Sequence, residues 1–450
     1  MTRPIEDFAR SDDYRNRIHD LVPGGAHTYS KGDDQFPSRA PAAIVRGRGS
    51  RVWDPDGNEY LDCSMGLTSV SLGHAHPPVL ERVRSELERG VNFQRPSVLE
   101  LEMAERFLGA VSQHDMVKFA KNGSTVTTAA VKLARALTGR PLVAFPGDHP
   151  FYSYDDWFIG STACRRGVPE EVSALSVTFR GCDLESLRAL FERHPGQIAC
   201  VITEPERSTC GAGCSCSTGV DDFLRQAIDL AHANGALFIL DEMVSGFKTD
   251  FPGAISRYDL RPDMATWGKG IANGFSFCAL TGTREVMELG GIRDEGAERV
   301  FLISTTHGAE THGMAAALAT LDAFEQEGVI EHNQTLGARF IERSRHELDA
   351  SGVGSAVRVV PCPWLPTFLF HDAEGAVSSG MRTLFMQEMI RWGVLFQGIV
   401  SPCLSHSDED VDLFGRAFGK ALEVYARALD EGWENHLVGP PAKPVFRSHV

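Results

Sequence analysis

The residues best suited to chemistry in this sequence are an acid and a lysine, Asp241 and Lys269. Asp241 and the adjacent Glu242 follow residues 236–240, a short run that is apolar at every position and typical of a strand covered on both faces. A carboxylate at the carboxyl end of a buried parallel strand points into the crevice where such sheets bind ligands. Lys269 lies between two glycines after an apolar segment, and burial there would lower the pKa of its amine toward the range of a nucleophile.

An acid that can protonate a ring nitrogen and a lysine that can bond to an aldehyde together indicate pyridoxal phosphate chemistry. A more ordinary interpretation also fits this pair. Many α/β proteins contain a strand that ends in Asp-Glu, and a lysine between glycines is commonly a loop residue. On Asp241 and Lys269 alone, both interpretations stay open.

Two segments are candidates for binding a phosphate group. Residues 122–125 read Asn-Gly-Ser-Thr and precede an alanine-rich segment with helical composition. The free amides and the positive dipole end at the start of a helix attract anions, although a plain helix N-cap explains this loop equally well. Thr305, Thr306 and Gly308 stand before a second alanine-rich segment and form the other candidate.

Alternation of strands and helices predicts an α/β fold with a doubly wound, mostly parallel sheet. Apolar strand-like runs occupy 142–145, 198–205 and 236–240, and helical spacing appears between them, as at 220–234. The second run ends in an acid, Glu204. An aromatic cluster that includes Phe151 follows the first run, and it could stack on a flat cofactor or simply pack in the core.

The pattern changes at both ends of this central region. Residues 44–61 predict a hairpin with its turn at Asp56-Gly57. After residue 330, helical segments and short strands predict a smaller α+β domain; they occupy 333–348, 357–360, 367–370, 380–392, 394–396 and 408–429. We therefore expect an N-terminal segment at 1–65 that joins the small domain, a large cofactor-binding domain at 66–330 and a C-terminal small domain at 331–450.

Composition limits the classes of partner. With 450 residues, 42% hydrophobic and 23% charged, the chain is an ordinary globular protein of more than one domain. Its formal charge of −16 argues against nucleic acid or an anionic membrane as the main partner. No apolar run approaches the ~20 residues that span a bilayer, and the polar N-terminus is unlike a secretory signal.

Most of the ten cysteines are scattered without regular spacing, which favours reduced thiols in a cytoplasmic protein. Cys210, Cys214 and Cys216 form the exception, since they fall within seven residues. Three thiols could bind a metal, but no fourth ligand accompanies them at a recognisable spacing, so we expect no metal site.

Several of these signals occur in the order typical of one family. The chain resembles class III pyridoxal-phosphate aminotransferases and, within them, the glutamate-1-semialdehyde 2,1-aminomutase-like branch. The stretches that carry the resemblance run from residue 22 to about 330; they are 23–25, 53–62, 73–77, 122–125, 203–205, 241–247, 268–270 and 273–274. The resemblance implies a fold-type I enzyme that binds pyridoxal 5′-phosphate and forms a homodimer with shared active sites.

The resemblance also implies roles for single residues. Lys269 looks like the lysine that holds the cofactor covalently and moves protons, and Asp241 like the acid that keeps the pyridine nitrogen protonated. The other positions that match cofactor contacts are Met243 against the ring, Gly123 and Ser124 at the phosphate, Phe151 as a stacking aromatic, Glu204 on the hydroxyl side, and Thr306 reaching the phosphate from the neighbouring subunit.

The departures from the family pattern concern the substrate. The aminomutase pattern has an arginine that grips the substrate carboxylate where this chain has Lys31, and lysine lacks the bidentate fork. Lys248 also replaces a usual arginine. Our leading hypothesis is therefore an aminotransferase acting between an amino donor and a small, possibly sugar-like, keto or aldehyde acceptor. The alternatives are a glutamate-1-semialdehyde 2,1-aminomutase and a catalytically silent cofactor-binding protein.

Overall fold

The computed structural model describes residues 3–148, 151–205 and 216–449, and for residues 216–221 it describes the backbone alone. The chain divides into two compact units. A terminal unit comprises Met1–His76 and Glu331–Val445, and a central unit comprises Pro77–Ile330 and Phe446–Val450. Whether each unit folds as an independent domain, with the boundaries expected from the sequence, stays a prediction.

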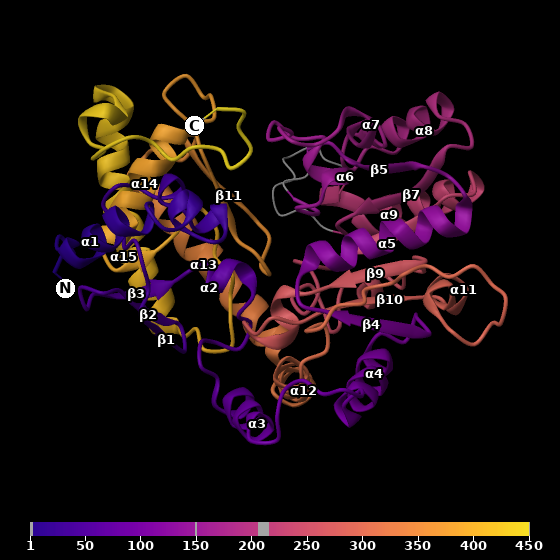
Figure 1. Ribbon diagram of the computed structural model, residues 1–450. Coiled ribbons are helices and arrows are strands. Elements are labelled where there is room, and N and C mark those ends of the chain that lie inside the picture. Colours follow the sequence, from indigo (N-terminus) through magenta and orange to yellow (C-terminus); the bar gives the residue numbers. More distant parts are fainter. Residues whose placement is uncertain (1–2, 149–150, 206–215, 450) are drawn as a thin grey trace. The chain divides into compact units, whose positions relative to one another are not determined.

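The central unit is built on a seven-stranded sheet of order β4-β10-β9-β8-β7-β5-β6 (Figure 1). Five neighbouring strands, from β9 to β6, run parallel, while β10 is antiparallel to both β9 and β4. The strands are β4 (Met116–Ala120), β5 (Leu142–Pro146), β6 (Ser176–Phe179), β7 (Ile198–Thr203), β8 (Leu237–Asp241), β9 (Met264–Trp267) and β10 (Cys278–Gly282). Strands β5, β7, β9 and β10 are buried at every position, as expected for a sheet covered on both faces.

Helices complete the α/β layers of the central unit. They are α3 (Pro77–Leu87), α4 (Val98–Ala110), α5 (Gly123–Thr138), α6 (Asp156–Ile159), α7 (Glu170–Ser173), α8 (Leu184–Arg193), α9 (Cys216–Ala233), α10 (Ala254–Arg257), α11 (Arg284–Met287) and α12 (Thr311–Gln326). Helix α5 packs across the middle of the sheet, because its small and branched residues are buried from Val126 to Ala134. This packing fixes the start of α5 near the carboxyl ends of the parallel strands, where ligands bind in such sheets.

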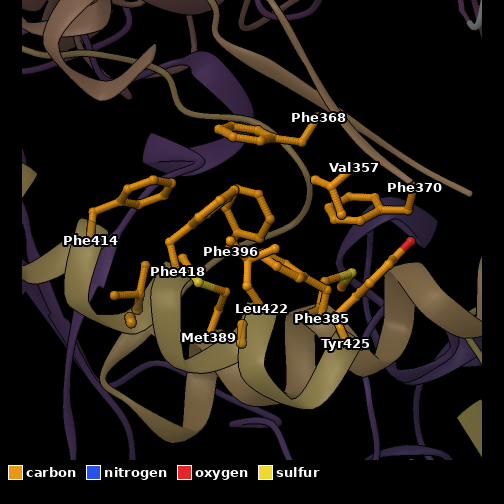
Figure 2. Close-up of a cluster of buried hydrophobic side chains, with 14 of the residues drawn as sticks. Val357, Phe368, Phe370, Phe385, Met389, Phe396, Phe414, Phe418, Leu422 and Tyr425 are labelled. Carbon is orange, nitrogen blue, oxygen red and sulfur yellow. The ribbon is translucent and has the colours of Figure 1, made fainter. Parts of the chain in front are cut away.

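The terminal unit combines both ends of the chain. A four-stranded sheet joins β1 (Arg46–Arg48), β2 (Arg51–Trp53) and β3 (Glu59–Asp62) to β13 (Val394–Leu395), and β11 (Val357–Val360) pairs with β12 (Thr367–Phe370). The helices are α1 (Ala9–Ile18), α2 (Met65–Thr68), α13 (Val329–Ser351), α14 (Ser379–Arg391) and α15 (Asp408–Glu431). Figure 2 shows its core, in which aromatic rings from β12, α14 and α15 pack together; Phe385 and Phe418 have ring centroids 4.9 Å apart.

The predicted α/β fold is confirmed, as are the strands at 357–360 and 367–370. The sequence interpretation missed β4, β6 and β10. Strand β4 has exposed Lys118 in the middle of five residues, and such a short run gives little periodic signal. Within the described residues, no helix is both long and apolar enough to cross a membrane.

Candidate active site

The carboxyl ends of β8 and β9 bring the acid Asp241 and the segment before Lys269 together. These strands are parallel, and Asp241 is paired in register with Thr266. The Thr266 hydroxyl donates a hydrogen bond to Asp241 Oδ1 at 2.8 Å, and the Met243 amide donates to the same oxygen at 2.9 Å. Two neutral donors therefore orient a buried carboxylate at the edge of the sheet.

Glu242 has a different role from Asp241, although both are buried. Its carboxylate accepts hydrogen bonds from Ser245 Oγ at 2.5 Å and from the Ile255 amide at 2.7 Å. Side chains at successive strand positions point to opposite faces, so the second acid is used to tie loop 245–255 to the sheet. The sequence identified both acids but could not distinguish these roles.

Lys269 adopts a backbone conformation that is unusual for a lysine. It opens a 3-10 helix (Lys269–Ala272) just after β9, with φ of 47°. The left-handed region costs an L-residue about 1–2 kcal/mol, so the fold holds Lys269 there against a local preference. Burial lowers the pKa of its amine, while the charges of Glu204, Asp241 and Cys278 act to raise it. A lowered pKa increases the neutral, nucleophilic fraction of this amine near neutral pH.

Met243 packs between the lysine segment and the start of α5. A Cβ atom added at Gly268 would lie 2.2 Å from Met243 Sδ, and one added at Gly123 would lie 3.0 Å from the same sulfur. Both glycines are therefore in contact with this thioether, and a larger residue at Gly268 would collide with it. Three predicted cofactor contacts, Lys269, Met243 and Gly123, belong to one packed arrangement.

The start of α5 has the features of an anion site. Asn122 is its N-cap, and the Asn122 side chain accepts from the Thr125 amide at 3.0 Å. Ser124 is buried, and its hydroxyl accepts from the Tyr154 amide at 3.0 Å. Among the described residues no acceptor contacts the amides of Gly123 and Ser124, which a helix leaves without an internal partner. These amides can bind a phosphate at the positive end of the helix dipole.

The aromatic residues near this site lie in two different environments. The Phe151 side chain is 49% exposed, and its ring stacks on Phe446 with centroids 6.4 Å apart. Tyr152, its neighbour, is buried, and burial together with the charges of Glu204 and Asp241 raises the pKa of its hydroxyl well above the usual range. Tyr152 was not singled out from the sequence. The stacking role of Phe151 stays a prediction.

Two predicted residues have no contact described with the residues above. Thr306 is exposed, and its carbonyl accepts from Asn92 Nδ2 at 3.1 Å. Lys31 belongs to the terminal unit, where it ends a 3-10 helix (Tyr29–Lys31) with an exposed side chain. The remaining predicted contact, Glu204, follows β7 and is partly buried.

Comparison with known proteins identifies the family to which this chain belongs. The model of the family described as Aminotransferase class-III matches residues 32–164 and 167–362. The chain belongs to the class-III aminotransferase family. Members of this family use pyridoxal phosphate.

Individual relatives cover nearly the whole chain. A glutamate-1-semialdehyde 2,1-aminomutase of Thermus thermophilus is 34% identical, over 94% of this chain and 100% of its own. A 3-aminobutyryl-CoA aminotransferase of Cloacimonas acidaminovorans is 28% identical, over 94% and 99%. The FumI protein of Sphingopyxis sp. MTA144, solved in its PLP internal aldimine form, superposes with a TM-score of 0.85 at 23% identity, over 97% of this chain and 100% of its own. This last likeness shows the fold, which is that of fold-type I enzymes.

The residues described above fit the class-III cofactor. A flat ring needs an open surface beside the lysine, and the glycines at 123 and 268 add no side chain there, where the side chains of Met243 and Cys278 are already close to Gly268. Its ring nitrogen would need a buried acid, a role that Asp241 could fill, and its phosphate would need amide donors, which the start of α5 could provide. All of these residues lie in the central unit.

Two lysines near the class-III site were not assigned a role from the sequence. Lys248 is only 5% exposed. Burial lowers its pKa to about 7, helped by the charge of Lys269 and opposed by Glu242. Lys121 immediately precedes the α5 cap and pairs with Glu310 at 2.8 Å, an acid that also contacts His307 at 2.7 Å. Burial of Lys248 could not have been foreseen, because a lysine is almost always exposed.

Metal binding finds no support in the described residues, among which no group of three or more His, Cys, Asp or Glu side chains could hold an ion. The loop with Cys210 and Cys214 lies outside the described residues, as does the side chain of Cys216. Cys278 is near Lys269, and burial raises the pKa of its thiol to about 12, which disfavours a reactive thiolate.

Proposed function

We propose that this class-III enzyme transfers an amino group between two separate molecules, an amino donor and a small keto or aldehyde acceptor. The observation that carries the proposal is the pairing of a lysine of lowered pKa, Lys269, with an oriented buried acid, Asp241, at one sheet edge. Pyridoxal phosphate, when bound, supplies a ring that withdraws electrons from the carbon bearing the amino group.

Each protein group has a defined task in this proposal. Lys269 would hold the cofactor covalently and then carry a proton to and from the reacting carbon. Asp241 would keep the ring nitrogen protonated, and the amides of Gly123 and Ser124 would hold the phosphate. Met243 packs where one ring face would lie. Further contacts in the proposal are Glu204, Phe151 and Thr306, the last from a partner subunit.

A homodimer is part of the proposal. Helices α3 and α4 and the segment between them leave large apolar side chains exposed; they are Leu87, Phe93, Val98 and Leu101. Val98 alone is 85% exposed, and exposed large apolar side chains on neighbouring segments are consistent with a subunit interface. A cytoplasmic setting is supported by the seven described cysteines, all of which are free thiols.

The second candidate is an intramolecular reaction on glutamate 1-semialdehyde. It is favoured by the 34% identity to an enzyme of that name over nearly the whole chain. Lys31 argues against it, since an exposed point charge replaces the bidentate arginine of that pattern. The third hypothesis, a catalytically silent protein, is disfavoured because both Lys269 and Asp241 are present.

A visible absorbance scan tests the proposal. We expect the purified protein with cofactor to show the band of lysine-bound pyridoxal phosphate, and an amino donor to bleach it as the amine passes to the cofactor. The variant Lys269→Ala should lose the band, while Lys118→Ala, an exposed lysine on β4, should keep it. Bleaching by 4,5-diaminovalerate but by no ordinary donor would favour the aminomutase. Absence of the band in the wild-type protein would reject the role of Lys269.

A further inference from the structure

Trp267, the last residue of β9, is held by a chain of buried hydrogen bonds within the central unit. Trp267 Nε1 donates to Thr281 Oγ1 at 2.8 Å, and Thr281 Oγ1 in turn lies 2.8 Å from His114 Nδ1. His114 Nε2 lies 3.0 Å from the carbonyl oxygen of Pro262, shortly before β9 begins. Trp267 and Thr281 are fully buried, and His114 is 6% exposed. The chain of bonds therefore ties the segment before β4 to β10 and to both ends of β9.

The donors and acceptors fix the direction of each bond in this chain. An indole N–H can only donate, so Thr281 accepts from Trp267. A carbonyl can only accept, so His114 Nε2 carries a proton and, in the neutral ring, Nδ1 accepts from the Thr281 hydroxyl. Burial lowers the pKa of His114 and so favours the neutral ring, although the bond to Pro262 and two nearby aspartates oppose the shift. The Ala265 carbonyl, at 3.4 Å from Thr281 Oγ1, is a longer contact.

The indole ring of Trp267 is held as firmly as its N–H group. The Phe107 ring of α4 meets it edge-on, with centroids 5.7 Å apart and planes at 88°. On loop 245–255, a Cβ atom added at Gly246 would lie 3.0 Å from Trp267 Cε3, so the backbone there is in close contact with the ring. A buried aromatic side chain that is packed on its ring and satisfied at its polar atom has little freedom to move. Trp267 is therefore a fixed point at the end of β9.

Two successive residues at the end of β9 are connected to the two chemical groups of the site. Side chains at successive strand positions point to opposite faces of a sheet. Thr266 shares a face with Asp241 and donates to its carboxylate at 2.8 Å. Trp267 points to the other face, where its hydrogen bonds hold it. The backbone then leaves the sheet through Gly268 and places Lys269 in the left-handed region, with φ of 47°.

A lysine in the left-handed region needs an anchor on each side. This conformation is unfavourable for a residue with a side chain, and it persists only where the surrounding structure enforces it. Downstream, the 3-10 helix that Lys269 opens contains the buried residues Ile271 and Ala272. Upstream, a single residue, Gly268, separates Lys269 from the anchored indole, and a glycine by itself resists rotation least. Loosening Trp267 would therefore let Lys269 relax toward an ordinary conformation and move its amine.

We propose that Trp267, held by Thr281 and His114, is a positioning residue that keeps the Lys269 amine where it meets the cofactor. The inference rests on the proposed role of Lys269 and adds the group of residues that sets its geometry. The hydrogen bonds of Trp267 act on the position of the amine, whereas burial acts on its pKa.

Formation of the lysine–cofactor bond by the full-length, cofactor-free protein tests this role without turnover. The readout is the rate at which the absorbance band of lysine-bound pyridoxal phosphate appears, over a series of cofactor concentrations. The maximal rate then reports bond formation, and the half-saturating concentration reports cofactor binding. Thr281→Val keeps the shape of the side chain without its hydroxyl, and we expect the maximal rate to fall about 10-fold at an unchanged half-saturating concentration. This effect is smaller than the roughly 10²-fold cost of a misplacement on the order of 1 Å.

Two further variants act on the same hydrogen bond. Thr281→Ser retains the hydroxyl and should restore most of the maximal rate. Trp267→Phe removes the donor and should slow the reaction at least as much as Thr281→Val does. Wild-type rates in both Trp267→Phe and Thr281→Val would overturn the proposal.

A matched threonine separates positioning from a general loss of stability. Thr383 of α14 is also fully buried, and its hydroxyl accepts from the Ala442 amide at 2.8 Å and donates to the Ser379 carbonyl at 2.6 Å. Thr383→Val should therefore lower stability in urea unfolding about as much as Thr281→Val while leaving the maximal rate unchanged. Equal slowing by the two variants would overturn the positioning role. A wild-type protein that forms no band would instead reject Lys269 as the cofactor residue, and with it the proposed amino transfer as well.

Discussion

Two buried aspartates, one in each unit, are stabilised in different ways. Asp410 in the terminal unit accepts from Arg51 at 2.5 Å, Ser50 Oγ at 2.9 Å and the Ser407 amide at 3.1 Å. Asp241 in the central unit accepts from a threonine hydroxyl and a backbone amide. The first carboxylate pairs with a fixed cation, whereas the hydrogen bonds described for the second come from neutral donors and its charge acts on the Lys269 amine.

The difference distinguishes a charged residue that stabilises the fold, Asp410, from one that we propose takes part in the reaction, Asp241. An ion pair such as Arg51–Asp410 satisfies both partners, so neither is left to act on a ligand. The charge of Asp241 instead acts on Lys269, the residue that we propose holds the cofactor. Asp62 in the terminal unit also has a side-chain partner, since it contacts His74 Nε2 at 2.9 Å and accepts from the Ser64 and Met65 amides.

The largest expected effect is on kcat and comes from replacing Asp241. Both described hydrogen bonds to Asp241 end on Oδ1, so Asp241→Asn can keep that one acceptor as its amide oxygen and should change the free energy of unfolding by about 1 kcal/mol or less. It removes the charge, and kcat should fall about 10²–10³-fold, as for other preorganised electrostatic groups. Steady-state kinetics and urea unfolding of one preparation measure both. A large loss of stability with unchanged kcat would show that Asp241 stabilises the fold and does not take part in the reaction.

Breaking the structural pair should give the opposite result. Arg51→Met leaves Asp410 buried without its cation and should destabilise the protein by about 3 kcal/mol, the low end for a buried pair, because Arg51 is 24% exposed. The absorbance band at Lys269 and kcat should be unchanged. Arg48→Met, an exposed arginine on β1, is the matched control and should be neutral. Comparable unfolding curves for the two variants would show that the pair contributes little.

A smaller effect is expected in the pH dependence of stability, through the buried amine of Lys248. The pKa of Lys248 is lowered from 10.5 to about 7. Between these values the unfolded chain binds more protons than the folded chain, so the free energy of unfolding should rise with pH, by at most about 1.4 kcal/mol per unit from this group. The groups that act on it are Lys269, Glu242 and the surrounding apolar core.

Lys248→Met should flatten that rise between about pH 7 and 10, because the replacement fills similar space without a titrating amine. Thermal midpoints of the cofactor-free protein across this range provide the measurement. Lys118→Met, exposed on β4, should follow the wild-type curve. If the Lys248→Met curve is as steep as the wild-type curve, the amine is not held in its neutral form by the fold.

Much of the fold was predictable because long periodic segments specify it. The helices at 333–348, 380–392 and 408–429 and the strands β11 and β12 stand within a few residues of their expected bounds. Strand β10 was missed, since its antiparallel place between β9 and β4 depends on pairing partners distant in sequence. Local pattern carries no information about such pairing.

The candidate site was predictable only in part. Asp241 and Lys269 could be named because residue type and position after a strand restrict their chemistry. The burial of Lys248 could not, since it depends on which residues pack around this side chain in three dimensions. Tyr152 and Phe151 are adjacent in sequence, and only packing decides which ring is buried.

The contact between Gly268 and Met243 limits how this enzyme can change. A Cβ at Gly268 would lie 2.2 Å from Met243 Sδ and 2.8 Å from Cys278 Sγ, so no single substitution at that position has room. In a mutational library, a larger residue at 268 should survive only beside a shortened residue at 243, and the two positions should vary together. New substrate specificities are therefore accessible to evolution, or to an engineer, mainly through positions away from this contact.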